Sequence, residues 1–166
     1  RAQGRGWRRA VAAAVVGATG TALVAVFPGG RSQEVMILIS GMKRRGQVPR
    51  VPVYLDGMNW EATALHAAYP EYLDDALKQR IFKENDNPLL SAIFKRVYSH
   101  EMRKRICDYP DPCIVLPTSG MLAGGPIMEY FLACVGYPLN VLFLFAFIFE
   151  GLFCLKLHRL FRRTPT

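Results

Sequence analysis

Four short apolar segments, separated by longer segments of helical periodicity, dominate the pattern of hydrophobic and polar positions along the chain. The apolar segments are residues 21–27, 51–55, 113–117 and 141–147, each bounded by Gly, Pro, Asn or Asp. Runs of this length with almost no polar residue are typical of strands that are covered by helices on both faces. The pattern therefore predicts an α/β fold in which a parallel β-sheet is flanked by helices.

Helical spacing is clearest after the first apolar segment. Residues 31–42 place Val35, Ile39 and Met42 on one side of a predicted helix. Two short helices are expected within residues 89–108, and the other predicted helices cover residues 59–69, 71–83, 126–134 and 151–162. The chain has no internal repeat and no low-complexity linker, so a single domain over residues 1–166 is expected.

Two of the predicted strands lead into loops of small residues that open a helix. The first loop, residues 27–34, reads FPGGRSQE, and the second, residues 117–126, reads PTSGMLAGGP. Free backbone N–H groups and the positive end of the helix dipole at such a turn attract a phosphate. Because both loops follow parallel strands, they should face the same edge of the sheet, where open α/β sheets bind ligands. Neither loop carries a P-loop or dinucleotide motif, so two ordinary turns are the alternative.

The net charge of the chain indicates that its ligand could also be a large anion. Lys and Arg outnumber Asp and Glu by 21 to 13, which gives a formal net charge of +8. Such an excess attracts RNA, DNA or acidic lipid. The basic residues form clusters, and the alternative for any one cluster is a solvated helix face. The clusters lie within residues 1–9, 43–50, 96–105 and 156–163.

Cysteine and histidine residues lack the spacing of a metal site. The four cysteines form no C-x-x-C pair and stand among apolar neighbours, which predicts reduced, buried thiols in a cytoplasmic protein. The three histidines form no H-x-H or H-E-x-x-H pair. We therefore expect no metal site and no small-molecule cofactor in this chain.

Two features of the chain ends bear on its cellular context. The chain starts with Arg, and glycines soon interrupt its Ala/Val run at residues 10–16, so a fragment is expected rather than a secretory signal. Near the other end, residues 141–149 are all apolar and a basic tail follows, which is the pattern of a membrane anchor. Such an anchor would be short, and Glu150 and Gly151 interrupt it. We expect a strand here and no membrane association, with the anchor as the alternative.

Four ordered stretches of this chain resemble the β-CASP domain of RNA-processing nucleases of the metallo-β-lactamase superfamily, in particular archaeal homologues of the cleavage and polyadenylation specificity factor nuclease. They are residues 27–39 (FPGGRSQEVMILI), 51–73 (VPVYLDGMNWEATALHAAYPEYL), 87–104 (NPLLSAIFKRVYSHEMRK) and 113–131 (CIVLPTSGMLAGGPIMEYF). The resemblance covers a core at residues 21–131 and continues weakly into a diverged tail at residues 132–166. In that tail Glu150-Gly151 matches, whereas Leu152 stands where the family has Thr.

The resemblance implies a Rossmann-like fold and the RNA-binding part of a zinc-dependent ribonuclease of RNA 3′-end processing. This part would cover the active-site cleft of a metallo-β-lactamase half that is absent here, with RNA and that half as partners. Catalytic and zinc-binding residues are then expected outside this chain. The implied RNA or phosphate contacts are Gly30, Arg31, Thr118, Ser119 and Gly120, and the implied loop-supporting residues are Gln33, Glu34 and Asp56. The alternatives are a soluble α/β module that binds a phosphate or nucleotide, and a membrane-anchored non-catalytic derivative.

Overall fold

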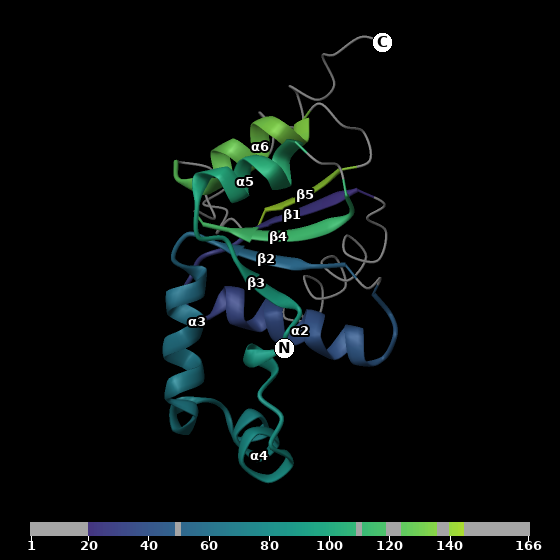
Figure 1. Cartoon of the computed structure of the whole chain (residues 1–166). Helices are drawn as coiled ribbons and strands as arrows, with labels where there is room; N and C mark the ends of the chain where they lie inside the picture. Colours follow the sequence, from purple (N-terminus) through teal and green to yellow (C-terminus); the bar gives the residue numbers. More distant parts are fainter. Residues whose placement is uncertain (1–19, 49–50, 109–110, 119–123, 136–139, 145–166) are drawn as a thin grey trace, which may run out of the picture.

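A five-stranded parallel β-sheet forms the centre of the structure (Figure 1). The computed structural model describes residues 20–48, 51–108, 111–118, 124–135 and 140–144. The strand order is β3-β2-β4-β1-β5, and each neighbouring pair is parallel. The strands are β1 (Thr21–Ala25), β2 (Val53–Asp56), β3 (Phe94–Arg96), β4 (Cys113–Pro117) and β5 (Val141–Leu144). The predicted α/β fold with a parallel sheet is therefore confirmed.

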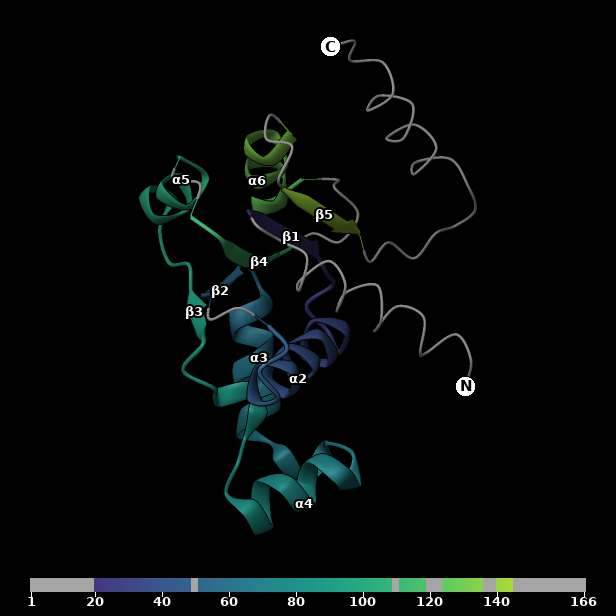
Figure 2. The same cartoon turned by 90° about the vertical axis from the view of Figure 1, so that its right-hand side faces the viewer.

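Helices cover both faces of this sheet. Figures 1 and 2 show α2 and α3 on one face, α5 and α6 on the other, and α4 farther from the sheet. The chain moves from β1 through β2 to the edge strand β3 and then returns through β4 to β5. Since parallel crossovers are right-handed, this change of direction places the two sets of helices on opposite faces. The helices are α2 (Arg31–Arg44), α3 (Asn59–Ala68), η1 (Pro70–Tyr72), α4 (Asp75–Glu84), η2 (Pro88–Leu90), α5 (His100–Asp108) and α6 (Pro126–Val135).

The apolar strands divide their side chains between two hydrophobic clusters. In β1, Val24 belongs to the cluster that includes Met36 of α2, whereas its neighbour Leu23 belongs to the cluster that includes Ile127 of α6. All four side chains have no exposed surface. Successive strand residues point to opposite faces, so a strand with a helix layer on each side must be apolar throughout.

One strand of the sheet was not predicted from the sequence. The two short helices expected within residues 89–108 correspond to η2 and α5, but the edge strand β3 lies between them. β3 has only three residues, and Lys95 and Arg96 are exposed, so it lacks the long apolar run of the central strands. Charged residues are common on edge strands because they discourage pairing with another chain. The helix expected over residues 71–83 is also interrupted, because Asp74 caps a new helix by accepting a hydrogen bond from the Leu77 N–H at 3.0 Å.

The apolar segment near the C-terminus enters the sheet. Residues Val141–Leu144 form β5, which pairs with β1 in parallel register. This supports the strand interpretation of the segment over that of an anchor. In the part of the chain that the structure describes, no helix is long and apolar enough to cross a membrane. The rest of the segment and the helix predicted over residues 151–162 lie outside the described residues.

Candidate functional site

At the carboxyl end of β4, the loops that follow neighbouring strands lead to helices on opposite faces of the sheet. β4 stands between β1 and β2, whose loops lead to α2 and α3, while its own chain leads to α6 on the other face (Figure 1). Open α/β sheets bind ligands at such switch points. Residues 28–31, residues 56–58 and Thr118 lie at the carboxyl ends of β1, β2 and β4, and we call them the carboxyl-edge surface. The Thr118 N–H donates to the Asp56 carbonyl at 3.3 Å, which ties two of the strand ends together.

The turn before α2 is fixed from inside the protein. Gly30 has φ +81°, a left-handed conformation that favours glycine. Its N–H donates to Oε1 of Gln33 at 2.8 Å, and Nε2 of Gln33 donates to Oγ1 of Thr63 on α3 at 3.0 Å. Gln33 is only 3% exposed. Its side chain therefore links the turn to α3 and does not face a ligand.

The backbone N–H groups of this turn are less available than the sequence suggested. Besides the Gly30 N–H, the Arg31 N–H donates to the Gly29 carbonyl at 3.0 Å, and the Ser32 N–H donates to the Phe27 carbonyl at 3.3 Å. The expectation of free N–H groups was therefore wrong for these three. Any attraction of this turn for an anion would therefore have to come from a positive side chain.

Arg31 is that side chain. Its Nη1 lies 2.7 Å from Oε2 of Glu34, and the two side chains are 39% and 45% exposed. An ion pair this exposed contributes little to stability. Glu34 therefore holds the guanidinium at the carboxyl-edge surface, next to the positive end of α2.

Thr118 is the most buried of the described residues that were predicted to contact RNA, and it lies directly against Gly57. It is 9% exposed, and its carbonyl accepts a hydrogen bond from the Ile127 N–H of α6 at 3.2 Å. Gly57 has φ +69°, and a Cβ atom placed there would lie 2.0 Å from Oγ1 of Thr118. The two residues thus define the start of the loop after β4. Ser119 and Gly120, the other predicted contacts of that loop, lie outside the described residues.

Asp56 is the acceptor of a buried hydrogen-bond network at the end of β2. Its side chain is 2% exposed. Nε and Nη2 of Arg103 donate to its two oxygens at 2.7 and 3.1 Å, and the Tyr130 hydroxyl donates to Oδ2 at 2.8 Å. The Gly57 N–H donates to Oδ1 at 2.6 Å. A bidentate guanidinium with two further donors satisfies a buried carboxylate that would otherwise be costly.

The network extends from Asp56 to the surface through Arg103. Nη1 of Arg103 donates to Oε1 of Glu129 at 2.9 Å, and Nδ1 of His100 lies 3.2 Å from Oε2 of Glu129. Hydrogen bonding to Asp56 raises the pKa of Arg103, and burial followed by the Asp56 charge raises the pKa of Tyr130. Both donors therefore keep their protons, and α5 and α6 are held in place against the end of β2.

Sequence reasoning missed Arg103 and Tyr130. Asp56 was predicted as a loop-supporting residue, but its partners lie 47 and 74 residues further along the chain. One signal pointed to such partners, because an acid that directly follows a buried strand needs donors close by. The basic cluster at residues 96–105 contained the arginine, but its spacing did not distinguish Arg103 from its neighbours.

The thiols of the described region do not form a reactive or metal-binding site. Cys107, Cys113 and Cys134 are free, and Cys113 is buried. Burial raises the pKa of Cys107 to about 11 and that of Cys134 to about 12, so both thiols are neutral near pH 7 and unreactive. Among the described residues, no group of three His, Cys, Asp or Glu side chains could hold a metal ion.

Comparisons of the sequence with known proteins find a family match and similar proteins. The sequence model of a family described as "Beta-Casp domain" matches residues 32–152. The transcription termination factor FttA of Methanosarcina mazei is 47% identical over 146 residues, which are 88% of this chain and 23% of that protein. FttA of Methanocaldococcus jannaschii is 52% identical over 111 residues, 67% of this chain and 17% of that protein.

The lengths of these matches show the family of the chain and the share of each relative that it covers. It spans less than a quarter of the length of either relative. The family match begins just after the glycine turn, includes the ends of β2 and β4, and extends past residue 131 to residue 152. Because the match covers more than half of its 166 residues, this chain belongs to the β-CASP domain family.

Proposed function

We propose that this chain is the RNA-binding β-CASP part of a longer protein that acts in RNA processing or transcription termination. Membership of the β-CASP family supports this proposal, as do relatives that are named transcription termination factors. The relatives extend well beyond the matched region, so other parts of such a protein would contribute to its activity. The formal net charge of +8 favours a polyanion as the ligand of this part.

One observation carries the proposal: Arg31 stands at a switch point of the sheet on a preformed turn. Its side chain is 39% exposed and lies at the first residue of α2, beside the carboxyl end of β4. A guanidinium recognises a phosphate oxygen pair well, and contacts to phosphates position a nucleic acid without reading its sequence. The Thr118 loop is the second element of the proposed contact, and we keep Ser119 and Gly120 as proposed contacts within it.

The same proposal assigns the chemistry of the complete protein to another part. We propose that a metallo-β-lactamase half of the protein binds zinc and hydrolyses RNA in 3′-end processing. The relatives are more than four times as long as the matched region, so they are long enough to contain such a half. This chain would cover the active site of that half and hold the RNA in position. A cytoplasmic location belongs to the proposal and agrees with the free thiols at Cys107, Cys113 and Cys134.

Replacing Arg31 with alanine should weaken the binding of single-stranded RNA by roughly fivefold, the effect of about 1 kcal/mol. The slope of log affinity against log salt concentration should fall by about one, because one phosphate contact is lost. Fluorescence anisotropy of a labelled oligoribonucleotide, titrated between about 50 and 200 mM salt, measures both quantities. Circular dichroism of the variant checks that its structure is retained.

Arg44→Ala is the matched control for this experiment. Arg44 is the last residue of the same helix and also forms an exposed ion pair, with Nη1 2.8 Å from Oδ2 of Asp86. The helix separates the two arginines by about 20 Å. Both variants remove one positive charge. Equal losses of affinity would mean that the effect of Arg31→Ala comes from the change in net charge, and would refute the proposed contact. Tight binding of a free nucleotide with no binding of RNA would overturn the RNA function itself.

A further inference from the structure

A groove of about 580 Å³ lies beside α5, outside the carboxyl-edge surface. It is within the size range of pockets that bind small ligands or single nucleotides. Its lining begins at the turn between β3 and α5, follows one side of α5, and ends at the starts of β2 and β4. The groove therefore runs from the carboxyl ends of the strands, where the proposed RNA contacts lie, toward their amino ends.

Two tyrosines give the groove aromatic walls. Tyr98, in the turn before α5, is 77% exposed, and Tyr54 of β2 is half-buried. An aromatic ring that exposed gains little from the protein's own core, whereas it offers a face on which a flat group can stack. Met102 and Ile106 of α5 supply apolar surface to the groove.

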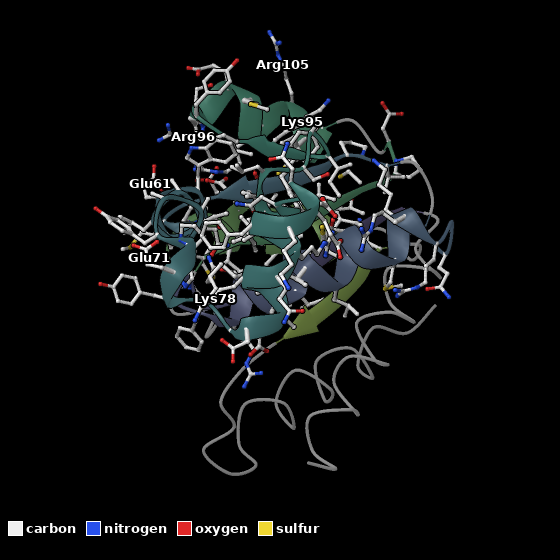
Figure 3. All side chains as sticks on the ribbon, turned by 90° about the horizontal axis from the view of Figure 1, so that it is seen from below. Glu61, Glu71, Lys78, Lys95, Arg96 and Arg105 are labelled. Atoms are coloured by element: carbon white, nitrogen blue, oxygen red, sulfur yellow. The ribbon has the colours of Figure 1, made fainter. Side chains whose placement is uncertain are left out.

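The charges of the groove favour a neutral ligand with N–H donors over a bare phosphate. Arg105 brings one positive charge, and Glu101 and Asp111 bring two negative charges. Figure 3 shows the Arg105 side chain extending outward from α5, where its planar guanidinium can stack on a ring. Carboxylates accept hydrogen bonds from the amino and imino groups of nucleobases but repel phosphates. Burial, followed by the charges of Cys113 and Asp111, raises the pKa of Tyr54, so its hydroxyl keeps its proton.

The position of the groove connects it to the proposed RNA path. Ser99 lines the groove, and its neighbour His100 pairs with Glu129, which also binds Arg103 of the Asp56 network. We infer that the groove is a subsite for one unpaired base of single-stranded RNA, with Tyr98 as the stacking residue. This inference rests on the proposed RNA function. It adds a contact to a base, whereas the proposed function needs only the phosphate contacts at the carboxyl-edge surface.

The test uses a short labelled oligoribonucleotide and a series of the same oligomer in which one base at a time is removed. Tyr98→Ala should weaken binding of the intact oligomer about tenfold, the effect of one lost base stack. Tyr98→Phe should bind like the unchanged chain. In the unchanged chain, removal of one particular base should have the same tenfold effect. In Tyr98→Ala, removal of that base should cost nothing further.

Tyr72→Ala is the matched control, because Tyr72 is 84% exposed and lies on η1, away from the groove. If Tyr98→Ala binds normally while Arg31→Ala binds weakly, the base subsite is refuted and the RNA function stands. If neither the unchanged chain nor any variant binds RNA, both proposals fall. If Tyr98→Ala loses affinity for an arginine-rich peptide while its RNA binding is unchanged, the groove is a peptide site and the inference is overturned.

Discussion

Replacing Asp56 with alanine is expected to lower the free energy of unfolding by about 3–5 kcal/mol. The variant leaves Arg103, whose side chain is 18% exposed, without the carboxylate that accepts two of its hydrogen bonds, and it also orphans the Tyr130 hydroxyl. Arg103 then keeps only the more exposed Glu129 carboxylate as a partner, and a largely buried charge that loses its buried partner costs far more than the pair contributes. Chemical denaturation monitored by circular dichroism measures this loss.

Two further variants separate charge from packing at this site. Asp56→Asn keeps the shape and one acceptor oxygen, so it should fall between the unchanged chain and Asp56→Ala. Glu61→Ala breaks another acid–arginine pair, with Arg96, whose side chains are 55% and 48% exposed (Figure 3). That variant should change the free energy of unfolding by no more than about 1 kcal/mol, as exposed pairs do. A similar loss for Asp56→Ala and Glu61→Ala would contradict the structural role of the network.

The central strands could be predicted from the sequence because their environment restricts their composition. β1 and β4 are buried along their whole length, and each appeared as an uninterrupted apolar run. β3 escaped detection because an edge strand pairs on one side only and tolerates Lys95 and Arg96. The apolar sequence of a strand therefore determined whether it could be recognised, because β5, at the other edge of the sheet, has such a sequence and was predicted.

The candidate site was predicted in outline, but its arrangement depends on the strand order. The loops after β1 and β4 were expected at one edge, yet only the order β3-β2-β4-β1-β5 makes those strands neighbours and adds the end of β2. Periodicity describes each segment separately and carries no information on which strands pair. For the same reason the donors around Asp56, which come from α5 and α6, could not be assigned from spacing.

Side-chain bonds within the first turn also altered the chemistry expected there. Gly-Gly before a helix indicated free N–H groups, but Gln33 occupies the Gly30 N–H and is itself bound by Thr63 of the next helix. A glutamine three residues after a turn is a known capping pattern, so this bond was accessible to sequence reasoning. It transfers the proposed anion attraction from the backbone to Arg31.

Gly57→Ala should lower the free energy of unfolding by about 2–5 kcal/mol, the second large effect expected at this edge. Two costs add up at this position. An alanine at φ +69° costs about 1–2 kcal/mol, and its Cβ would lie 2.0 Å from Oγ1 of Thr118, which adds an overpacking cost of about 1–3 kcal/mol. RNA affinity should fall as well, because Thr118 starts the loop that carries the proposed contacts.

The contact between Gly57 and Thr118 can be isolated by a double-mutant cycle. Thr118→Ala removes the colliding oxygen, so adding Gly57→Ala to it should cost only the backbone term of about 1–2 kcal/mol. Thr118→Val puts a methyl group where the hydroxyl was, so Gly57→Ala should cost as much there as in the unchanged chain. Equal costs in the Thr118→Ala and Thr118→Val backgrounds would mean that the close approach does not constrain the loop. The turn after β2 would then owe its shape to the backbone of Gly57, and Thr118 would lose its proposed part in positioning RNA.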